Sequence, residues 1–218
     1  MRFVDRAGEA VLATAGEMVR RGLVEGTAGN VSARRHDGTI VITPSATDYR
    51  SMGLDDLVVI DPRGEVVHAK DGHSPSTEAA LHLACYQAFD DVGAVIHAHP
   101  VWATMFAVAR QPIPACIDEF SIYVGGEVRC SDYGPSGTMA MAHRAVLALE
   151  GRGAALLANH GMVAVGPSPD RALHITALVE RCAQIVWGAR ALGGAVPLPD
   201  EANDHFARTY NLLRADPA

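Results

Sequence analysis

Apolar residues near the N-terminus recur at intervals of three or four positions, which is the spacing of one face of an α-helix. The residues that share this spacing are Val4, Ala7, Val11, Ala15 and Met18. Gly22 follows the pattern and is suited to ending a helix, because glycine adopts the left-handed conformation without strain. The pattern therefore predicts an amphipathic helix from about Val4 to Gly22.

Short runs rich in β-branched residues follow, separated by turn sequences. Thr39–Thr43 is one such run and stops at Pro44, and Leu57–Ile60 is another. Asp61–Gly64 then has the composition of a turn and leads into Glu65–His68. We expect the last two runs to pair as a β-hairpin.

A helix and three apolar strands are predicted in the next part of the chain. The helix opens at Pro75-Ser76 and runs to about Phe89, with Ser76 as its N-cap and Glu78 in its first turn, where the helix dipole favours a carboxylate. The predicted strands are Ala94–His99, Ala154–Asn159 and Met162–Val165, and His160-Gly161 separates the last two.

Two more helices are predicted, over about Asp170–Leu192 and about Asp200–Leu213. Because hairpin signals alternate with helices, we expect a mixed or largely antiparallel sheet with helices packed over it. No repeat or linker divides the chain, and 218 residues is an ordinary length for one domain. The predicted fold class is therefore α/β, in a single domain over residues 1–218.

The composition is that of a globular protein, with 49% hydrophobic and 20% charged residues. The formal net charge of -7 argues against a nucleic-acid partner, which usually requires a basic surface. No apolar run approaches the ~18 residues of a membrane span, and the N-terminus lacks the apolar core of a signal peptide. We expect a cytoplasmic protein that binds neither nucleic acid nor membranes, with its four cysteines reduced.

The clearest chemical signal is His97-Ala98-His99, at the end of a predicted strand. Alternation along the strand puts both histidines on one face, about 7 Å apart, where the two imidazoles can bind one ion. Ala94 and Ile96 then point to the opposite face, towards a core. Two solvent-exposed histidines on a polar face are the alternative, and this motif alone does not exclude it.

His160 and Glu78 extend the possible metal site. His160 ends an apolar strand and precedes Gly161, which permits a sharp turn or a close approach. Three histidines and one open position are typical of a catalytic zinc site. Glu78 is the candidate carboxylate, although a glutamate at a helix start needs no such role. His82, one helical turn later on the same face, is a reserve ligand.

The other histidines lack this pattern. We expect surface positions for those in polar or turn-like stretches, and a packing or surface position for His174, which lies in a predicted helix. The histidines expected at the surface are His36, His68, His73, His143 and His205.

Three polar loops place small or hydroxyl residues beside glycine or proline: Gly26–Asn30, Thr43–Ala46 and Pro75–Thr77. Their N–H groups and hydroxyls suit a phosphate monoester, and Ser76 and Thr77 stand at a predicted helix N-terminus, which favours anions. Each loop by itself can equally be an ordinary turn, because turns use the same residues. No Walker or dinucleotide motif is present, so neither ATP nor NAD is expected.

Together these motifs resemble the class II aldolase/adducin family over nearly the whole chain. The segments that carry the resemblance, in the family's order, are Gly26–Ser32, Ile42–Ser45, Pro75–Glu78, His97–His99 and Asn159–Gly161. The resemblance implies a three-layer α/β/α fold with a central, mainly antiparallel sheet. It also implies a zinc-dependent homotetramer whose active sites lie at subunit interfaces.

By position, the resemblance assigns zinc to His97, His99 and His160, and makes Glu78 both a resting zinc ligand and the acid/base. The positions that match the phosphate ligands are Gly29, Asn30, Ser45, Ala46, Ser76 and Thr77. The implied reaction cleaves a ketose 1-phosphate, such as L-fuculose 1-phosphate, into dihydroxyacetone phosphate and a small aldehyde such as L-lactaldehyde. Zinc would stabilise the charge of the enediolate, and Glu78 would carry the proton.

Two places depart from the family pattern. Ala46 replaces a glycine of the phosphate loop. The segment Ile117–Tyr123 replaces the stretch in which the family's aldolases carry a catalytic tyrosine, so Glu119 and Tyr123 are candidate accessory acids, and Tyr210 could correspond to the family's C-terminal tyrosine. These departures leave the aldehyde partner open.

Other activities of the family remain alternatives: a pentulose-5-phosphate 4-epimerase, a methylthioribulose-phosphate dehydratase, a sugar-acid phosphate decarboxylase, or a non-enzymatic module like the adducin head. The compact spacing from His99 to His160 favours an aldolase over an epimerase. Retention of all three metal histidines disfavours the adducin-like module. Imidazole ligands suit several divalent ions, so another metal can replace zinc in this prediction.

Overall fold

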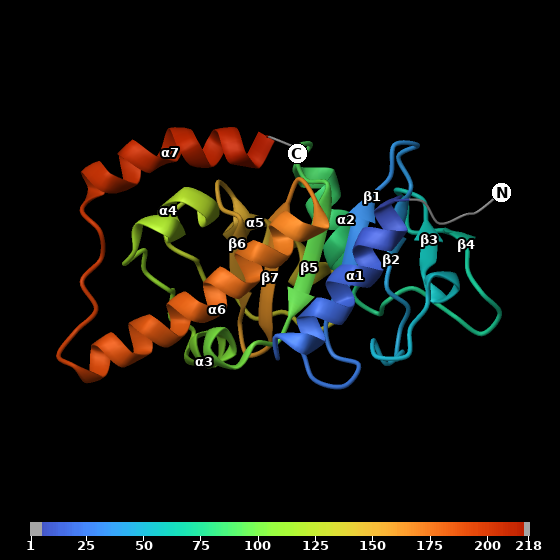
Figure 1. Ribbon diagram of the computed structural model, residues 1–218, viewed down its shortest axis with the longest axis horizontal. Helices are drawn as coiled ribbons and strands as arrows, with labels where there is room; N and C mark the ends of the chain where they lie inside the picture. Colours follow the sequence, from blue (N-terminus) through green and yellow to red (C-terminus); the bar gives the residue numbers. More distant parts are fainter. Residues whose placement is uncertain (1–5, 216–218) are drawn as a thin grey trace.

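Seven strands form one antiparallel sheet at the centre of the protein (Figure 1). The computed structural model describes residues 6–215. The strands are β1 (Asn30–Arg34), β2 (Ile40–Ile42), β3 (Val58–Ile60), β4 (Val66–His68), β5 (Ala94–Ala98), β6 (Ala154–Leu157) and β7 (Gly161–Gly166). Their order across the sheet is β4-β3-β2-β1-β5-β7-β6, and each neighbouring pair is antiparallel. A parallel bridge between Cys130 and Leu156 lies beside β6.

Helices cover both faces of this sheet and produce three layers. The helices are α1 (Arg6–Arg20), α2 (Ala79–Ala88), α3 (Val101–Ala109), α4 (Asp118–Val124), α5 (Met139–Leu149), α6 (Pro169–Ala191) and α7 (Asp200–Ala215), with a short 3-10 helix, η1 (Leu54–Asp56), before β3. α1 and α6 pack on one face, and α2 and α5 pack on the other (Figure 1). α7 packs along α4. The predicted three-layer α/β/α fold is confirmed.

The central strand β5 sorts its side chains between the two cores. Val95 lies in the core formed with α2 and α5, whereas Ala94 and Ile96 lie in the core formed with α1. By the same alternation His97 points to the side of Val95, as predicted. In Figure 1 the carboxyl end of β5 lies at the lower edge of the sheet, where α3 begins. The histidine motif therefore lies at the carboxyl end of a central strand.

Several predicted elements are confirmed with small shifts of their ends. Leu23 donates its N–H to the carbonyl of Met18 at 2.9 Å and Gly22 has a φ of 67°, so α1 ends at the predicted C-cap. Val4 lies outside the described residues. α6 begins after Ser168, whose hydroxyl accepts the N–H of Arg171.

Four elements were missed by the pattern analysis: β1, α3, α4 and α5. β1 buries Asn30 and Ser32, so its polar side chains do not mark an exposed face. α3 is apolar on its exposed side too, with Val101 63% and Val108 57% exposed, which removes the contrast between faces that identifies an amphipathic helix.

The start of α2 differs from the prediction. The helix begins at Ala79, Glu78 is its N-cap residue and Ser76 precedes it. The N–H of Ser76 donates to the carbonyl of Thr43 at 3.2 Å, and its hydroxyl accepts the N–H of Glu78 at 3.2 Å, in the turn just before the helix. Glu78 therefore does not lie in the first helical turn, and the serine caps that turn instead of the helix itself.

No helix within residues 6–215 is long and apolar enough to cross a membrane. The four cysteines all lie in this part of the chain and are unpaired, as expected.

Candidate metal centre

Three histidine rings meet where β5 ends and where the hairpin between β6 and β7 turns. The ring centroids of His97 and His99 are 4.7 Å apart, those of His97 and His160 are 4.7 Å apart, and those of His99 and His160 are 4.9 Å apart. One nitrogen of each ring lies within 4.8 Å of the others. His97 is fully buried, whereas the other two rings reach the surface. The structure thus brings together the three histidines that the sequence singled out.

The tautomer of His97 is fixed by the backbone. Its Nδ1 lies 2.8 Å from the carbonyl oxygen of Met162, which can only accept, so Nδ1 carries the proton and donates it. The lone pair of Nε2 in the neutral ring therefore faces the site, 2.8 Å from His99 Nε2 and 3.0 Å from Glu78 Oε2. Acceptor atoms this close need a shared proton or a cation between them.

The spacing of these atoms fits a divalent metal ion. A tetrahedral site with metal–nitrogen bonds of about 2.0 Å separates its ligand atoms by roughly 3.3 Å. Glu78 Oε1 lies 3.5 Å from His160 Nε2, and Glu78 Oε2 lies 3.0 Å from His97 Nε2. His160 Nδ1 is buried without a hydrogen-bond partner among the described residues, so no group there fixes its tautomer as Met162 fixes that of His97.

Burial favours the neutral state of His99 and His160, which is the state that binds metal. Burial and the neighbouring His97 and His160 rings lower the pKa of His99 to about 4. Burial, followed by the His97 ring, also lowers the pKa of His160. Both rings are therefore predominantly unprotonated at neutral pH and ready to coordinate.

Glu78 is held by hydrogen bonds on both of its oxygens. The amide Nδ2 of Asn30 donates to Oε2 at 3.1 Å, and the hydroxyl of Ser136 donates to Oε1 at 2.9 Å. Burial acts to raise the pKa of Glu78, but the contact with His97 and the bond from Asn30 outweigh burial and hold the pKa below its ordinary value. The group beside the histidines is thus a carboxylate.

Two backbone features place the third histidine. Asn159 adopts a left-handed conformation with a φ of 57°, and its side-chain oxygen accepts from Arg110 Nε at 3.0 Å. A Cβ on Gly161 would lie 2.5 Å from the carbonyl of Ala98 and 2.6 Å from Cδ2 of His99. Gly161 is therefore required for the close approach that the sequence suggested, and it brings His160 beside His99.

A polar cleft of about 180 Å³ opens beside the histidines. It is lined by all six of the predicted phosphate positions, together with Glu78, His99, Ser136 and His160. The N–H groups of Ser45 and Ser76 are already used, because they donate to the carbonyls of Ser74 and Thr43. These two serines can therefore reach a ligand through their hydroxyls, and the prediction that every loop offers free N–H groups holds only in part.

Ala46 has a φ of 54°, in the left-handed region that a glycine would occupy without strain. Ala46 therefore takes the backbone conformation that a glycine would take here, and it does so at a conformational cost.

The candidate accessory acids lie elsewhere in the chain. Glu119 is 3.7 Å from Arg181 at the surface, and Tyr123 packs its ring on His174. Tyr210 is buried, and its hydroxyl accepts from Arg214 at 2.8 Å. None of the three candidates lines the cleft within the described chain, so a role in catalysis would require them to act in the site of a neighbouring subunit.

The remaining histidines follow the prediction in part. His36, His143 and His205 are exposed, and His174 is exposed with its ring against Tyr123. His68 and His73 are half-buried rather than free at the surface, because the β3–β4 hairpin and its neighbouring loop cover them; His73 lies 3.4 Å from Asp56.

His82 is not placed as a reserve metal ligand. It faces the same side of α2 as Glu78, but its ring nitrogens contact Asn30 and Ser32 and the ring is outside the histidine group. Ser136 was not predicted, because it lies in a loop before α5 and belongs to no motif. Only contact across the fold reveals it.

Three histidines at a sheet edge, a buried carboxylate beside them and an adjoining polar cleft define a metal-dependent enzyme of the α/β class. The chain belongs to the class II aldolase and adducin family, since the family model for the class II aldolase and adducin N-terminal domain matches residues 9–187. It is an enzyme of the metal-dependent aldolase type.

Similar proteins extend over most of the chain. The L-fuculose phosphate aldolase of Escherichia coli K12 is 35% identical over 198 residues, which are 90% of each protein. The 5-deoxy-D-ribulose 1-phosphate aldolase of Bacillus thuringiensis serovar kurstaki is 31% identical over 209 residues, 95% of this chain and 97% of that protein. A solved structure of an L-fuculose 1-phosphate aldolase matches with a TM-score of 0.90 and 36% identity, covering 95% of this chain and 97% of that one.

Proposed function

We propose that the protein is a zinc-dependent aldolase that cleaves a ketose 1-phosphate into dihydroxyacetone phosphate and a small aldehyde. The observation that carries the proposal is the position of Glu78, with one oxygen 3.0 Å from His97 Nε2 and the other 3.5 Å from His160 Nε2 at the mouth of a polar cleft. A carboxylate at this point can leave a metal ion and still reach the substrate carbon beside it.

Cleavage removes a proton from the substrate hydroxyl, breaks the adjacent carbon–carbon bond and releases the aldehyde. The electron pair of that bond stays on the dihydroxyacetone phosphate fragment, whose carbon must then gain a proton. A divalent ion at the histidines supplies Lewis-acid stabilisation of this negative charge. In this proposal Glu78, a carboxylate at rest, accepts the hydroxyl proton and then delivers it to that carbon, while Asn30 and Ser136 hold its two oxygens in position.

The substrate class is inferred from the cleft and from the relatives. Ser45, Ser76 and Thr77 bring hydroxyl groups to the lining of the cleft, which suits a phosphate group at one end of the sugar. The relatives compared above are named for L-fuculose phosphate and for 5-deoxy-D-ribulose 1-phosphate, and the similar solved structure for L-fuculose 1-phosphate. We therefore favour L-fuculose 1-phosphate or a 5-deoxypentulose 1-phosphate as substrate, with L-lactaldehyde or a similar aldehyde as product.

The reaction is tested by incubating the purified protein with a panel of phosphorylated ketoses. Release of dihydroxyacetone phosphate from a ketose 1-phosphate is the expected result. Epimerisation at C4 of a pentulose 5-phosphate, dehydration or decarboxylation without any aldol cleavage would instead assign one of the alternative family reactions.

The metal is tested by elemental analysis of protein purified without chelator. We expect close to one equivalent of zinc per chain, and its loss in a variant with His97→Ala and His99→Ala. Another transition metal at the same stoichiometry would support the site but correct the metal. Less than a third of an equivalent of any such metal would count against the whole proposal.

Glu78→Gln tests the proton carrier. The amide keeps the size of the side chain but cannot accept and deliver the proton, so turnover should fall by roughly two orders of magnitude or more. Steady-state kinetics of the metal-loaded variant measure this loss. Near-normal turnover with full metal occupancy would remove Glu78 from the reaction.

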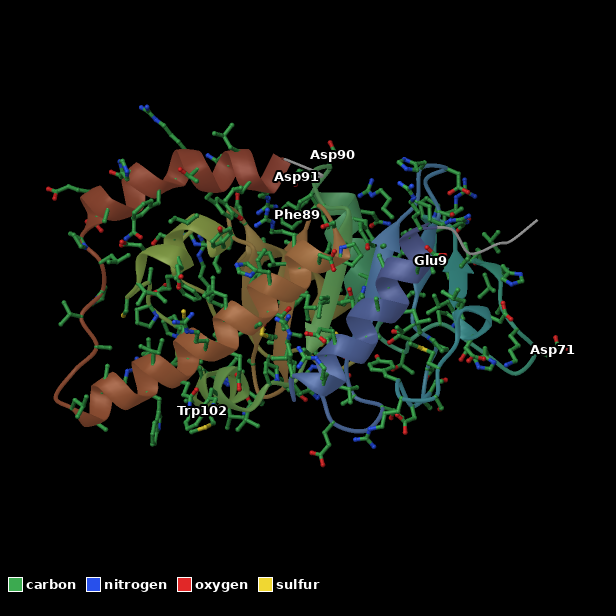
Figure 2. All side chains as sticks on the ribbon, in the orientation of Figure 1. Glu9, Asp71, Phe89, Asp90, Asp91 and Trp102 are labelled. Carbon is green, nitrogen blue, oxygen red and sulfur yellow. The ribbon has the colours of Figure 1, made fainter. Side chains whose placement is uncertain are left out.

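The assembly is proposed to be a homotetramer with the sites at subunit interfaces. α3 follows directly after His99-Pro100, and it carries apolar side chains that face outward, Met105 at 42% and Val108 at 57% exposure. Trp187 on α6 lies beside this helix, with its ring 5.1 Å from that of Trp102, whose place at the lower edge is labelled in Figure 2. This apolar surface beside the metal centre supports contact with another copy there.

A further inference from the structure

A network of buried polar side chains reaches Glu78 through Asn30. His82 is fully buried on α2; its Nε2 lies 2.5 Å from Asn30 Oδ1 and its Nδ1 lies 2.6 Å from Ser32 Oγ. Ser32 Oγ lies 2.7 Å from the hydroxyl of Tyr86. The hydrogen-bonded network therefore runs from Tyr86 through Ser32, His82 and Asn30 to the carboxylate of Glu78.

The ionised carboxylate of Glu78 determines which atom donates and which accepts in each hydrogen bond of this network. An ionised carboxylate only accepts, so Asn30 presents Nδ2 to Glu78 and its oxygen to His82. His82 must then donate from Nε2, which leaves a lone pair on Nδ1 to accept the hydroxyl of Ser32. Ser32 in turn accepts from Tyr86. Each buried group is satisfied in one arrangement only.

The environment of His82 supports this neutral tautomer. Burial lowers the pKa of His82 to about 3, and the neighbouring His97 ring acts in the same direction. A neutral imidazole has one donor and one acceptor, which matches the two partners of the ring. Because the network is buried, an unsatisfied member costs more than an exposed one would.

We propose that His82 is a positioning residue for the reaction inferred above: its Nε2–H holds the Asn30 carboxamide in the one orientation that points an N–H at Glu78. Without that donor, Asn30 Oδ1 is left buried without its partner, and the carboxamide is held only through its contact with Glu78. The carboxamide can then move to find another partner for its oxygen, and Glu78 shifts with it from its place beside the histidines. The effect of His82 on turnover rests on the proposed function. Its effect on the orientation of Glu78 does not, because metal binding can be measured without substrate.

The test compares His82→Leu, which removes the donor, with His82→Gln, which keeps both a donor and an acceptor. Each variant is loaded with Co²⁺, and its visible spectrum and Co²⁺ dissociation constant are measured without substrate. We expect His82→Leu to change the spectrum and to weaken binding about tenfold, and His82→Gln to restore most of both. In turnover, His82→Leu should lower kcat at least tenfold while KM changes less than threefold.

Thr176→Val is the matched control, because Thr176 is also fully buried and donates to the carbonyl of Ala172 at 2.8 Å far from the cleft. It should alter the thermal unfolding midpoint without changing the Co²⁺ spectrum. A wild-type spectrum in His82→Leu would overturn the proposal, as would a failure of His82→Gln to restore the spectrum when both variants fold.

A double-variant cycle tests whether His82 acts through Asn30. Adding His82→Leu to Asn30→Ala should cause no further loss of Co²⁺ affinity, and an additive loss would overturn the proposal. If His82→Leu does not fold, His82→Phe decides, because it keeps a planar ring at this buried position and lacks the donor. A changed spectrum is expected there, and an unchanged one overturns the proposal. Absence of any sugar-phosphate cleavage by the wild type would contradict the proposed function but leave these metal measurements valid.

Discussion

The candidate metal centre depends on single residues whose contacts leave little room for a larger or different side chain. Gly161 is the clearest case, because its missing side chain allows the hairpin turn to lie against β5 and against the ring of His99. His97 shows a different constraint, since one backbone carbonyl decides which of its nitrogens faces the site. At this scale, geometry is set by contacts between residues that are far apart in the sequence.

Gly161→Ala should weaken metal binding by about tenfold or more, equivalent to about 1.4 kcal/mol. The new Cβ would lie 2.6 Å from His99 Cδ2, so the ring or the hairpin must move. Competition with a chromophoric chelator measures the change. Gly188→Ala is the matched control, because nothing lies within 4 Å of a Cβ at that helical position. Equal metal affinities in the two variants would contradict the close-approach argument.

Ala46→Gly should stabilise the protein by about 0.5–1 kcal/mol, since the left-handed conformation costs an L-residue about 1–2 kcal/mol and glycine's extra unfolded-state entropy offsets about half of that. The φ of 54° at Ala46 is the basis of this expectation. Chemical denaturation measures it. The same substitution inside α6, Ala189→Gly, should destabilise by about 1 kcal/mol. Finding the same sign for both variants would show that backbone strain at Ala46 is negligible.

Among the residues of the site, the histidines could be predicted best. His97 and His99 follow from strand alternation alone, because two positions of a strand on one face are separated by one residue. Glu78 could not be assigned from its neighbours, since a glutamate at a helix start has an ordinary explanation. The contacts of Asn30 and Ser136 with Glu78 depend on the tertiary fold and leave no local pattern.

At the level of elements, the junction between β5 and α3 directly follows the candidate metal ligands. Pro100 stands at the N-cap position of α3 and offers no side-chain hydrogen bond to the helix. Glu180 of α6 supplies it instead, accepting from the N–H groups of Trp102 at 3.0 Å and Ala103 at 2.8 Å. A neighbouring helix therefore caps the segment that directly follows His99.

Glu180→Ala should lower the free energy of unfolding by about 1–2 kcal/mol, because it leaves two helix N–H groups without their acceptor and removes a charge that the helix dipole favours. Denaturant titration measures the loss, and Glu180→Gln should fall between the variant and the wild type. Glu65→Ala, at an exposed position of a hairpin, serves as the control with little expected effect. A loss below about 0.3 kcal/mol in Glu180→Ala would contradict the capping role.

Elements were predicted where their faces differ in polarity and missed where they do not. α1 has a clear buried stripe and was placed within two residues at its C-terminus. The strands β5 and β7 are apolar throughout and bounded by turn residues, so their positions were also predicted. α3 is apolar on both sides, and α2 begins at Ala79, later than expected. Side-chain patterns report burial, and they fail where an exposed helix face is also apolar.

For the whole molecule, an exposed apolar surface lies beside the candidate metal centre. The outward side chains of α3 and Trp187 of α6 form this apolar surface, and the nearest strand end carries His99. The opposite end of the sheet differs, because Arg214 of α7 pairs there with Asp91, beside Phe89 and Asp90 in Figure 2. The two ends of the sheet thus differ. α7 packs beside one end, and the exposed apolar side chains of α3 lie at the other.

We expect the wild-type protein to have four times the 23.0 kDa mass of the chain in solution. Met105→Glu places a charge on the apolar surface and should shift the mass towards smaller species, with reduced activity. Light scattering coupled to size exclusion measures both masses. Leu147→Glu, at a 69% exposed position of α5 on the other face of the sheet, is the control. A monomeric wild type would contradict the proposed assembly.

The sequence by itself determined the class of fold, the three histidines and the loops of the cleft, because these depend on local periodicity and on motifs whose order is preserved. It did not determine what holds Glu78. The tertiary structure alone decided that Asn30 and Ser136 contact its carboxylate, that His82 supports Asn30 instead of binding metal, and that Gly161 brings the third histidine to the first two. The physical reason is that these contacts join β1, α2, β5 and a distant loop, and a hydrogen bond across the fold imposes no spacing on the chain.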